Sequence, residues 1–283
     1  MRVPALADRP VTPALRACFE KLGPGPEDYR ELAAILAEEW VARAPRRVGL
    51  GGGQGAGKST LADLAVQACA LRGMRAAALA LDDFYLGRDE RRALAVRVHP
   101  LFETRGPPGT HDIALLSEIV NALLESGPVQ VPVFDKGGDD RAGWRTLEGP
   151  FDLVLLEGWC IGAGPLDPAS LRAPINALER SADAAGAWRR YFADQLATRY
   201  AALFDDLDFL AFLRVPDLAA VRRWRLQQES ERSAEQRMSA AQVDLFVAHY
   251  ERITLSMLAE LPERAELTVS LDADHAIADL RFR

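Results

Sequence analysis

The stretch GGGQGAGKST, residues 51–60, decides how the rest of the sequence is interpreted. It fits the pattern G-x-x-x-x-G-K-[ST], a glycine-rich loop between a strand and a helix, at Gly52, Gly57, Lys58 and Ser59. Glycines allow positive φ and let backbone N–H groups close around phosphate oxygens. The helix that begins near Lys58 adds its unpaired N–H groups and the positive end of its dipole. The stretch therefore predicts a loop that binds a nucleoside triphosphate.

Two side chains in this loop have more specific expected roles. Lys58 reaches the β- and γ-phosphates as a compact charge, and Ser59 is a ligand for Mg²⁺. ATP and Mg²⁺ are thus the predicted cofactors. The residues expected to contact the nucleotide are Gly52, Gly53, Gln54, Gly55, Ala56, Gly57, Lys58, Ser59 and Thr60.

The composition is that of an ordinary globular protein. The chain has 283 residues, of which 49% are hydrophobic and 27% charged. It has no apolar run of membrane length, and its N-terminus resembles neither a signal peptide nor a transit peptide. We therefore expect a cytoplasmic enzyme. The net charge of −7 disfavours a nucleic-acid or anionic-membrane partner, but it is compatible with a small anionic ligand held by a few local cations.

Short apolar segments alternate with helical segments along the chain. Strands are expected over 46–51, 74–86, 128–136, 151–159, 208–217 and 266–274. Helices are expected in the first 45 residues and over 58–73, 113–126, 181–206, 218–232 and 240–261. This order predicts an α/β P-loop NTPase fold, with a mainly parallel, doubly wound sheet, flanking helices and a helical lid.

We predict a single catalytic domain with an appended segment. Residues 1–45 are expected to be a helical segment packed on the core, and residues 46–283 a P-loop kinase domain with its lid around 216–240.

The sequence lacks an N-K-x-D element, which argues against a GTP switch. The strand at 151–159 ends in one carboxylate, Glu157, followed by glycine, so transfer to a bound substrate is favoured over activation of water.

Carboxylates end two of the predicted strands. Asp82 and Asp83 end the second strand, and ligands lie at the carboxyl edge of parallel sheets. A carboxylate there can accept the proton of an attacking hydroxyl, although a helix cap or turn is the alternative for both residues. Glu157 ends an apolar strand, where Mg²⁺ is its natural partner and a structural salt bridge is the alternative.

Arginines provide the remaining expected contacts to the phosphates. Arg222 and Arg225 lie three residues apart on the predicted helix 218–232, so we expect them to share one face. From a lid they would clamp the oxygens of the phosphoryl group in transfer. The alternative is a solvated basic face.

Eight segments, taken in order, resemble the P-loop D-glycerate 3-kinase family of plants and its fungal and bacterial relatives. This family is related to uridine kinase, phosphoribulokinase and the P-loop pantothenate kinases. The resemblance runs from about residue 45 to the C-terminus. The segments are GGGQGAGKST, LDDFYL, RGPPGTHD, PVFDKGGDDR, LLEGWCIG, INALE, RRWRLQQE and MSAAQVDLFVAHYER.

The resemblance implies ATP-dependent phosphorylation of D-glycerate to 3-phosphoglycerate. It implies that Asp82 is the catalytic aspartate, that Glu157 lies near Mg²⁺, and that the lid arginines are Arg222 and Arg225. Plant members carry an Asn-Ala-Gly-Ser-like segment where this chain has residues 107–110, PPGT, so acceptor choice is less firmly implied than phosphotransfer. The residues expected to line the acceptor pocket are Asp83, Tyr85, Arg105, His111, Asp112, Lys136 and Arg141.

The residues alone leave the acceptor open. Of 34 basic residues only three are lysines, and two of them, Lys58 and Lys136, lie in motifs. An anionic hydroxy acid needs a cation such as Lys136, Arg141 or Arg105. The alternatives are that Lys136 pairs with Asp135 or Asp139 and that Arg105 is solvated. His111 is either a substrate donor or a neighbour of a helix cap. Alternative acceptors are a nucleoside, a pantothenate-like acid or another sugar acid, and a non-catalytic ATP-binding regulator is a second class.

Overall fold

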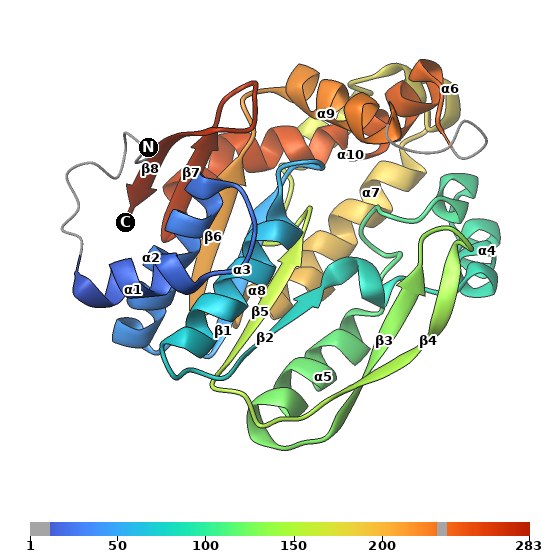
Figure 1. The fold of residues 1–283 in the computed structure, drawn as a ribbon. Coiled ribbons are helices and arrows are strands. Elements are labelled where there is room, and N and C mark those ends of the chain that lie inside the picture. Colours follow the sequence, from blue (N-terminus) through green and yellow to red (C-terminus); the bar gives the residue numbers. More distant parts are fainter. Residues whose placement is uncertain (1–11, 231–236) are drawn as a thin grey trace.

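A central sheet organises the part of the chain that the computed structural model describes, residues 12–230 and 237–283. The strand order is β2-β5-β1-β6-β7-β8, and every neighbouring pair is parallel except β7 with β8 (Figure 1). The predicted mainly parallel sheet is confirmed. Its strands are β1 (Arg47–Gly52), β2 (Ala76–Ala80), β5 (Leu153–Gly158), β6 (Phe209–Arg214), β7 (Leu267–Leu271) and β8 (Ile277–Phe282).

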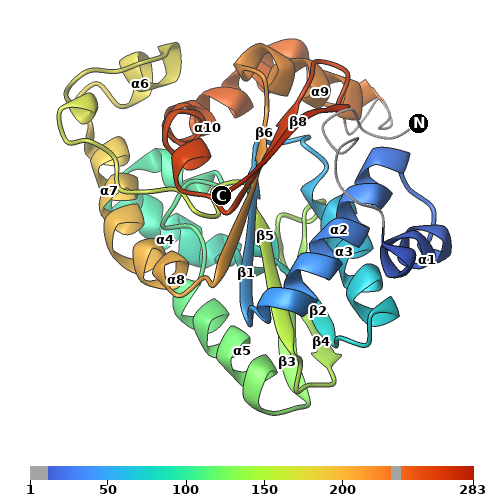
Figure 2. The same ribbon diagram turned by 90° about the vertical axis from the view of Figure 1, so that its left-hand side faces the viewer.

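Helices cover both faces of this sheet, as expected of a doubly wound fold (Figure 2). On one face lie α1 (Pro13–Lys21), α2 (Glu27–Arg43) and α3 (Lys58–Leu71). The other face is covered by α5 (Ile113–Glu125), α7 (Ala187–Gln195), the π-helical turn Leu196–Tyr200 and α8 (Ala201–Asp205). Above the carboxyl ends of the strands lie α9 (Leu218–Ser230) and α10 (Ala240–Glu260), at the top of Figure 1.

Two predicted segments extend beyond the described residues. The predicted N-terminal segment 1–45 includes residues 1–11, and the predicted lid 216–240 includes residues 231–236. In the described part, α2 packs on α3, and its buried side chains, among them Leu32 and Ile35, belong to the same core as those of β1. The described part of the N-terminal segment thus shares a core with the P-loop strand.

The segment 128–136 forms a strand, but not in the main sheet. It is β3 (Val129–Asp135), which pairs antiparallel with β4 (Asp140–Leu147) in a separate two-stranded sheet, seen beside α5 in Figure 1. Strands β1 and β5 are buried almost throughout, whereas β4 alternates between half-buried and exposed residues. That polar alternation is typical of an antiparallel pair with one solvated face, and the sequence analysis missed β4 for this reason.

Further elements were also absent from the sequence-based expectation. These are β8, the helices α4 (Arg88–Arg97) and α6 (Ala177–Ala182), and the 3₁₀ turns Leu81–Phe84, Pro100–Glu103 and Ser170–Arg172. In α4, the three buried residues include Arg91, whose guanidinium donates to the backbone carbonyl of Leu86 over 2.8 Å. A charged residue therefore faces inward there, so the segment lacks the apolar periodicity that predicts a helix.

The register of the parallel strands places three functional segments at one edge. Glu157 in β5 pairs with Leu50 in β1 and with Ala80 in β2. The loop after β1, the end of β5 and the segment after β2 therefore lie side by side at the carboxyl edge, where ligands bind in open α/β sheets. No described helix is both long and apolar enough to cross a membrane.

Candidate active site

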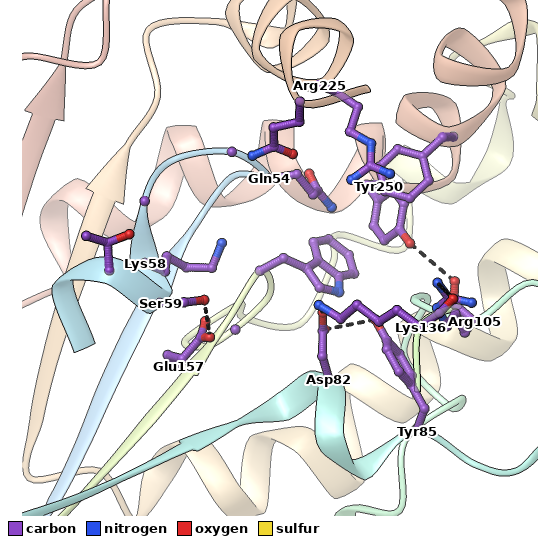
Figure 3. Close-up of a pocket in the computed structure, with 17 residues that line it drawn as sticks. Gln54, Lys58, Ser59, Asp82, Tyr85, Arg105, Lys136, Glu157, Arg225 and Tyr250 are labelled. Carbon is purple, nitrogen blue, oxygen red and sulfur yellow. Dashed lines mark hydrogen bonds and ion pairs between the residues drawn. The ribbon is translucent and has the colours of Figure 1, made fainter. Parts of the chain in front are cut away.

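A cleft of about 380 Å³ opens at this edge of the sheet, beneath α9 and α10 (Figure 3). Its size is within the range of about 300–1,000 Å³ found for small-molecule sites. The loop after β1 forms one wall, and the segments after β2 and β3 form the opposite one. Charged side chains of both signs point into it, as expected of a site for polyanionic ligands and metal ions.

The glycine-rich loop supplies six of its nine predicted nucleotide contacts to the cleft. They are Gln54, Gly55, Gly57, Lys58, Ser59 and Thr60. Gly55 and Gly57 have φ angles of +80° and +79°, in the left-handed region that favours glycine. Three residues do not line the cleft: Gly52 and Gly53 precede the turn, and the side chain of Ala56 is buried behind it. Only the backbone groups of these three residues are available to a ligand.

Lys58 and Glu157 lie close together at the base of the cleft. The Lys58 ammonium donates to the Gly53 carbonyl over 3.0 Å. Burial lowers the pKa of Lys58, while the nearby carboxylates of Glu157 and Asp82 oppose that shift. The γ- and β-phosphates of a triphosphate would add negative charge here, so binding such a ligand would further favour the charged ammonium.

Ser59 and Glu157 form a site suited to Mg²⁺. The Ser59 hydroxyl donates to Glu157 Oε1 over 2.6 Å. Burial raises the pKa of Glu157, against the opposing effects of Lys58 and of the Ser59 hydrogen bond. No group of three or more acidic, histidine or cysteine side chains able to hold a metal occurs among the described residues. Mg²⁺ is usually held by few protein oxygens together with phosphates and water, so the Ser59 hydroxyl and the Glu157 carboxylate are a suitable set of donors.

Asp82 lies on the opposite wall, just after β2. Its Oδ1 accepts a hydrogen bond of 2.9 Å from the Tyr85 hydroxyl, and its Oδ2 lies 2.7 Å from the Lys136 ammonium. Burial acts to raise the pKa of Asp82, but Lys136 and Tyr85 outweigh it, so the pKa is lowered. Asp82 is therefore an ionised carboxylate held in place from two sides, able to accept a hydrogen bond from a substrate hydroxyl.

The turn between β3 and β4 supplies cations to the same wall. Lys136 begins this turn and pairs with Asp82, which differs from the sequence-based alternative of a neighbouring aspartate. Arg105 donates to the Lys136 carbonyl over 3.2 Å and forms an ion pair with Asp139. Asp139 is also paired with the buried guanidinium of Arg91 over 2.7 Å. The position of Lys136 is thus supported by a network of fixed charges.

Four residues expected in the acceptor pocket do not line the cleft. Asp83 accepts from the Phe134 amide over 3.3 Å, so it anchors β3. Asp112 accepts from the Leu115 amide over 3.1 Å and caps α5. Asp112 is thus a helix cap, whereas Asp83 accepts from a distant strand and is neither the helix cap nor the turn residue that was its alternative.

The other two support the pocket from behind. His111 is buried, its Nδ1 lies 2.6 Å from the Tyr200 hydroxyl, and its ring stacks on Tyr85 at 4.5 Å between centroids. Burial lowers the pKa of His111 to about 4, so the ring is neutral near pH 7. Arg141 donates to the Tyr85 carbonyl over 3.4 Å. Tyr85 itself lines the cleft, as predicted, together with Lys136 and Arg105.

The two lid arginines point in different directions. Arg225 lines the cleft, pairs with Glu229 over 2.6 Å, and lies 4.7 Å from the ring centroid of Phe246. Arg222 is exposed and forms an ion pair with Asp244 on α10. In this structure only Arg225 points into the cleft, and the expectation that both arginines clamp phosphate stays a prediction. Residues three apart on a helix differ by about 60° in direction, which suffices to separate them here.

The cleft also contains residues that the sequence analysis did not assign to it. Tyr250 donates to the Arg105 carbonyl over 3.2 Å, Trp159 donates to the Gly106 carbonyl over 3.2 Å, and their rings meet edge to face at 4.8 Å. The other additions are Gly158, Gln228 and Phe246. Phe246 and Tyr250 are four residues apart on α10, a spacing that resembles an ordinary core face. Of the three aromatic residues, only Trp159 could have been predicted to line the cleft, because it lies two residues after Glu157.

The fold and the site are those of a P-loop kinase: the glycine-rich loop, the Ser59–Glu157 pair and the carboxylate of Asp82 share one cleft. No family model matches the sequence. A kinase of Schizosaccharomyces pombe named mug58, described as uncharacterized, is 32% identical over 239 residues, which are 79% of this chain and 84% of that protein. The chain belongs to this glycerate kinase-like family of P-loop phosphotransferases.

Two further relatives carry a substrate in their names. The chloroplastic D-glycerate 3-kinase of Arabidopsis thaliana is 29% identical over 225 residues, which are 73% of this chain and 46% of the plant protein. The structure of a D-glycerate 3-kinase from Cryptococcus neoformans superposes with a TM-score of 0.73 and 26% identity, covering 90% of this chain and 99% of that one. The resemblance predicted from the sequence is confirmed.

Proposed function

We propose that this protein is an ATP- and Mg²⁺-dependent kinase that converts D-glycerate to 3-phosphoglycerate. The observation that supports it most directly is the pair Asp82–Lys136, which faces Lys58 across one cleft. Asp82 can accept a hydrogen bond from a substrate hydroxyl, and Lys136 beside it can bind a substrate carboxylate. Both lie where a small hydroxy acid would meet the γ-phosphate. The choice of D-glycerate among such acids is based on two relatives that are named D-glycerate 3-kinase.

The loop wall is proposed to hold the triphosphate. Backbone N–H groups of the loop and the Lys58 ammonium bind the phosphate oxygens, and Arg225 approaches the transferring group from α9. Ser59 and Glu157 would hold Mg²⁺, directly or through water. When bound, Mg²⁺ neutralises charge on the β- and γ-phosphates.

The opposite wall is proposed to hold the acceptor. Asp82 accepts a hydrogen bond from the attacking hydroxyl and takes its proton as the oxygen bonds to the γ-phosphorus. The bond from that phosphorus to the β–γ bridging oxygen breaks, and ADP leaves. Lys136 and Arg105 provide the positive charge that binds the substrate carboxylate. Two cations on this wall favour a hydroxy acid over an uncharged nucleoside, while another sugar acid or a pantothenate-like acid stays an alternative.

The cytoplasmic location and the absence of a nucleic-acid partner stay predictions from the sequence.

The test is an acceptor panel with the purified protein and Mg-ATP. ADP release is followed with D-glycerate, L-glycerate, pantothenate and uridine, and the phosphorylated product is identified by phosphorus NMR. We expect ADP and 3-phosphoglycerate with D-glycerate and the lowest KM for that acid. ADP release with uridine alone would contradict the proposed acceptor, and no ADP release with any acceptor would contradict the proposed reaction.

Replacing Lys136 by methionine is expected to raise the KM for D-glycerate about 10–100-fold, because a hydrogen bond to a charged group contributes roughly 1.5–3 kcal/mol. The KM for ATP should change less than twofold. Lys21→Met, which removes an exposed lysine from α1, is the matched control and should leave both constants unchanged. An equal rise in both KM values for Lys136→Met would place Lys136 outside the acceptor site.

For Lys136→Met we also expect a changed dependence of kcat/KM on pH. In the native protein burial acts to raise the pKa of Asp82, and Lys136 is the largest of the opposing effects that hold this pKa below its ordinary value. Without Lys136 the largest effects that lower this pKa are lost, so the pKa of Asp82 rises. The acidic limb of the kcat/KM profile for D-glycerate should therefore move to higher pH in Lys136→Met than in the wild type. An unmoved acidic limb would argue against Asp82 as the titrating base.

A further inference from the structure

The outer side of the loop between β1 and α3, residues 53–57, is held by side chains from two distant parts of the chain. The Tyr29 hydroxyl donates to the Ala56 carbonyl over 2.7 Å, and His275 Nε2 lies 3.0 Å from the Gly55 carbonyl. Tyr29 belongs to α2, and His275 to the turn between β7 and β8. Because a carbonyl only accepts hydrogen bonds, His275 must carry its proton on Nε2 to make this contact.

These contacts determine which way the loop peptides face. In a trans peptide the carbonyl and the following N–H group point in opposite directions. Holding the Ala56 carbonyl toward Tyr29 therefore places the Gly57 N–H group on the other side, and Gly57 lines the cleft. Holding the Gly55 carbonyl directs the Ala56 N–H group to the Gly53 carbonyl, to which it donates over 3.2 Å, so this contact fixes the turn of the loop from within. A loop that binds an anion needs its N–H groups on the ligand side.

Tyr29 is packed directly against the loop. A Cβ atom added at Gly57 would lie 2.8 Å from Cε1 of Tyr29, closer than real Cβ atoms approach. The side chain of Tyr29 is buried, and burial raises its pKa, so the hydroxyl remains a proton donor over the working pH range. The ring and its hydroxyl thus set both the position and the orientation of the peptide before Gly57.

The two contacts belong to one connected scaffold. The Asp28 carboxylate accepts from the amide of Tyr29 over 2.9 Å and from the amide of Ile277 over 3.1 Å. Asp28 therefore ties α2 to the turn that carries His275. The His275 ring in turn stacks on Trp224 of α9 with centroids 3.9 Å apart. Three elements far apart in sequence meet behind the phosphate-binding loop.

We propose that Tyr29 and His275 are positioning residues for nucleotide binding, which act by orienting the peptides of the loop. This inference rests on the proposed nucleotide-binding role of that loop. Through these residues, α2 and the turn between β7 and β8 would contribute to the affinity for ATP. The sequence had left open the role of the N-terminal segment that contains α2. Neither residue lines the cleft, so neither is expected to influence the choice of acceptor.

The test compares two buried tyrosines: Tyr29, which contacts the nucleotide wall of the cleft, and Tyr200, which contacts the acceptor wall. Tyr29→Phe keeps the ring and removes the hydroxyl on the nucleotide side. Tyr200→Phe removes a hydroxyl that accepts from the Gly109 amide over 3.1 Å, on the acceptor side. Calorimetric titration with Mg-ATP should show a Kd about 3–10-fold higher for Tyr29→Phe, the effect of one hydrogen bond. The Kd of Tyr200→Phe for ATP should equal that of the wild type within twofold.

His275 allows a rescue experiment. His275→Gln keeps an N–H donor at a similar distance along the side chain, whereas His275→Leu has none. The two variants share any strain from the positive φ of 67° at this position. We expect the leucine variant to bind ATP about 3–10-fold more weakly and the glutamine variant to recover most of that loss.

The outcomes separate this inference from the proposed function. Wild-type protein that binds no Mg-ATP would contradict the proposed function itself. Wild-type binding with an unchanged Kd in Tyr29→Phe and His275→Leu would overturn the inference alone. An equal rise in the ATP Kd and the acceptor KM of Tyr29→Phe, with a lowered melting temperature, would also overturn it, because that pattern indicates a general loss of structure.

Discussion

Replacing Asp82 by asparagine is expected to lower kcat for phosphoryl transfer about 10²–10⁴-fold, the usual contribution of a positioned general base. The amide cannot take the proton of the attacking hydroxyl, and it no longer attracts the Lys136 ammonium, which lies 2.7 Å from Oδ2 in the native site. Binding of Mg-ATP should be nearly unchanged, because Asp82 lies on the wall opposite the phosphate-binding loop (Figure 3). Steady-state kinetics together with calorimetric titration of ATP measure both quantities.

Asp83→Asn is the matched control for this variant. Asp83 is the next residue, but its carboxylate accepts from the Phe134 amide, and an asparagine oxygen can accept the same hydrogen bond. We expect kcat of Asp83→Asn to stay within about threefold of the wild type, well below the effect of a lost base. A larger loss in Asp83→Asn than in Asp82→Asn would show that the wrong carboxylate has been assigned to the reaction.

Replacing Arg225 by alanine is expected to lower kcat about 10²–10³-fold, as does removal of a single charge-stabilising donor from other active sites. Arg225 enters the cleft from α9, and its direction is set by Glu229 and by the ring of Phe246. The buried carboxylate of Glu229 also accepts from the Met238 amide over 2.9 Å, which links α9 to the start of α10. The guanidinium is therefore preorganised, and its loss should affect transfer more than ground-state binding.

Arg222→Ala removes the same functional group from the same helix without touching the cleft. Its ion pair with Asp244 is exposed, and such pairs contribute little to stability. We expect kcat and both KM values of Arg222→Ala to stay within twofold of the wild type. Equal losses in the two alanine variants would mean that the closed enzyme brings both arginines to the phosphates, and would favour the sequence-based expectation over the observed geometry.

The sequence identified the phosphate-binding loop and the class of fold because both depend on local patterns. Consecutive residues of 51–60 form the loop, and strands buried on both faces appear as unbroken apolar runs. The hairpin of β3 and β4 was only half predicted, because β4 is largely exposed and its alternating polar residues resemble a loop. Pattern alone also did not show that this hairpin stands apart from the main sheet.

What the sequence by itself determined about this protein is the chemistry: a strand, a glycine loop with Lys58 and Ser59, and carboxylates at the ends of neighbouring strands. Only the tertiary structure decided which candidates share the cleft, because the direction of a side chain depends on contacts with residues distant in sequence. Asp82 faces Lys136 whereas Asp83 turns to Phe134, and Arg225 is held in the cleft whereas Arg222 pairs with α10.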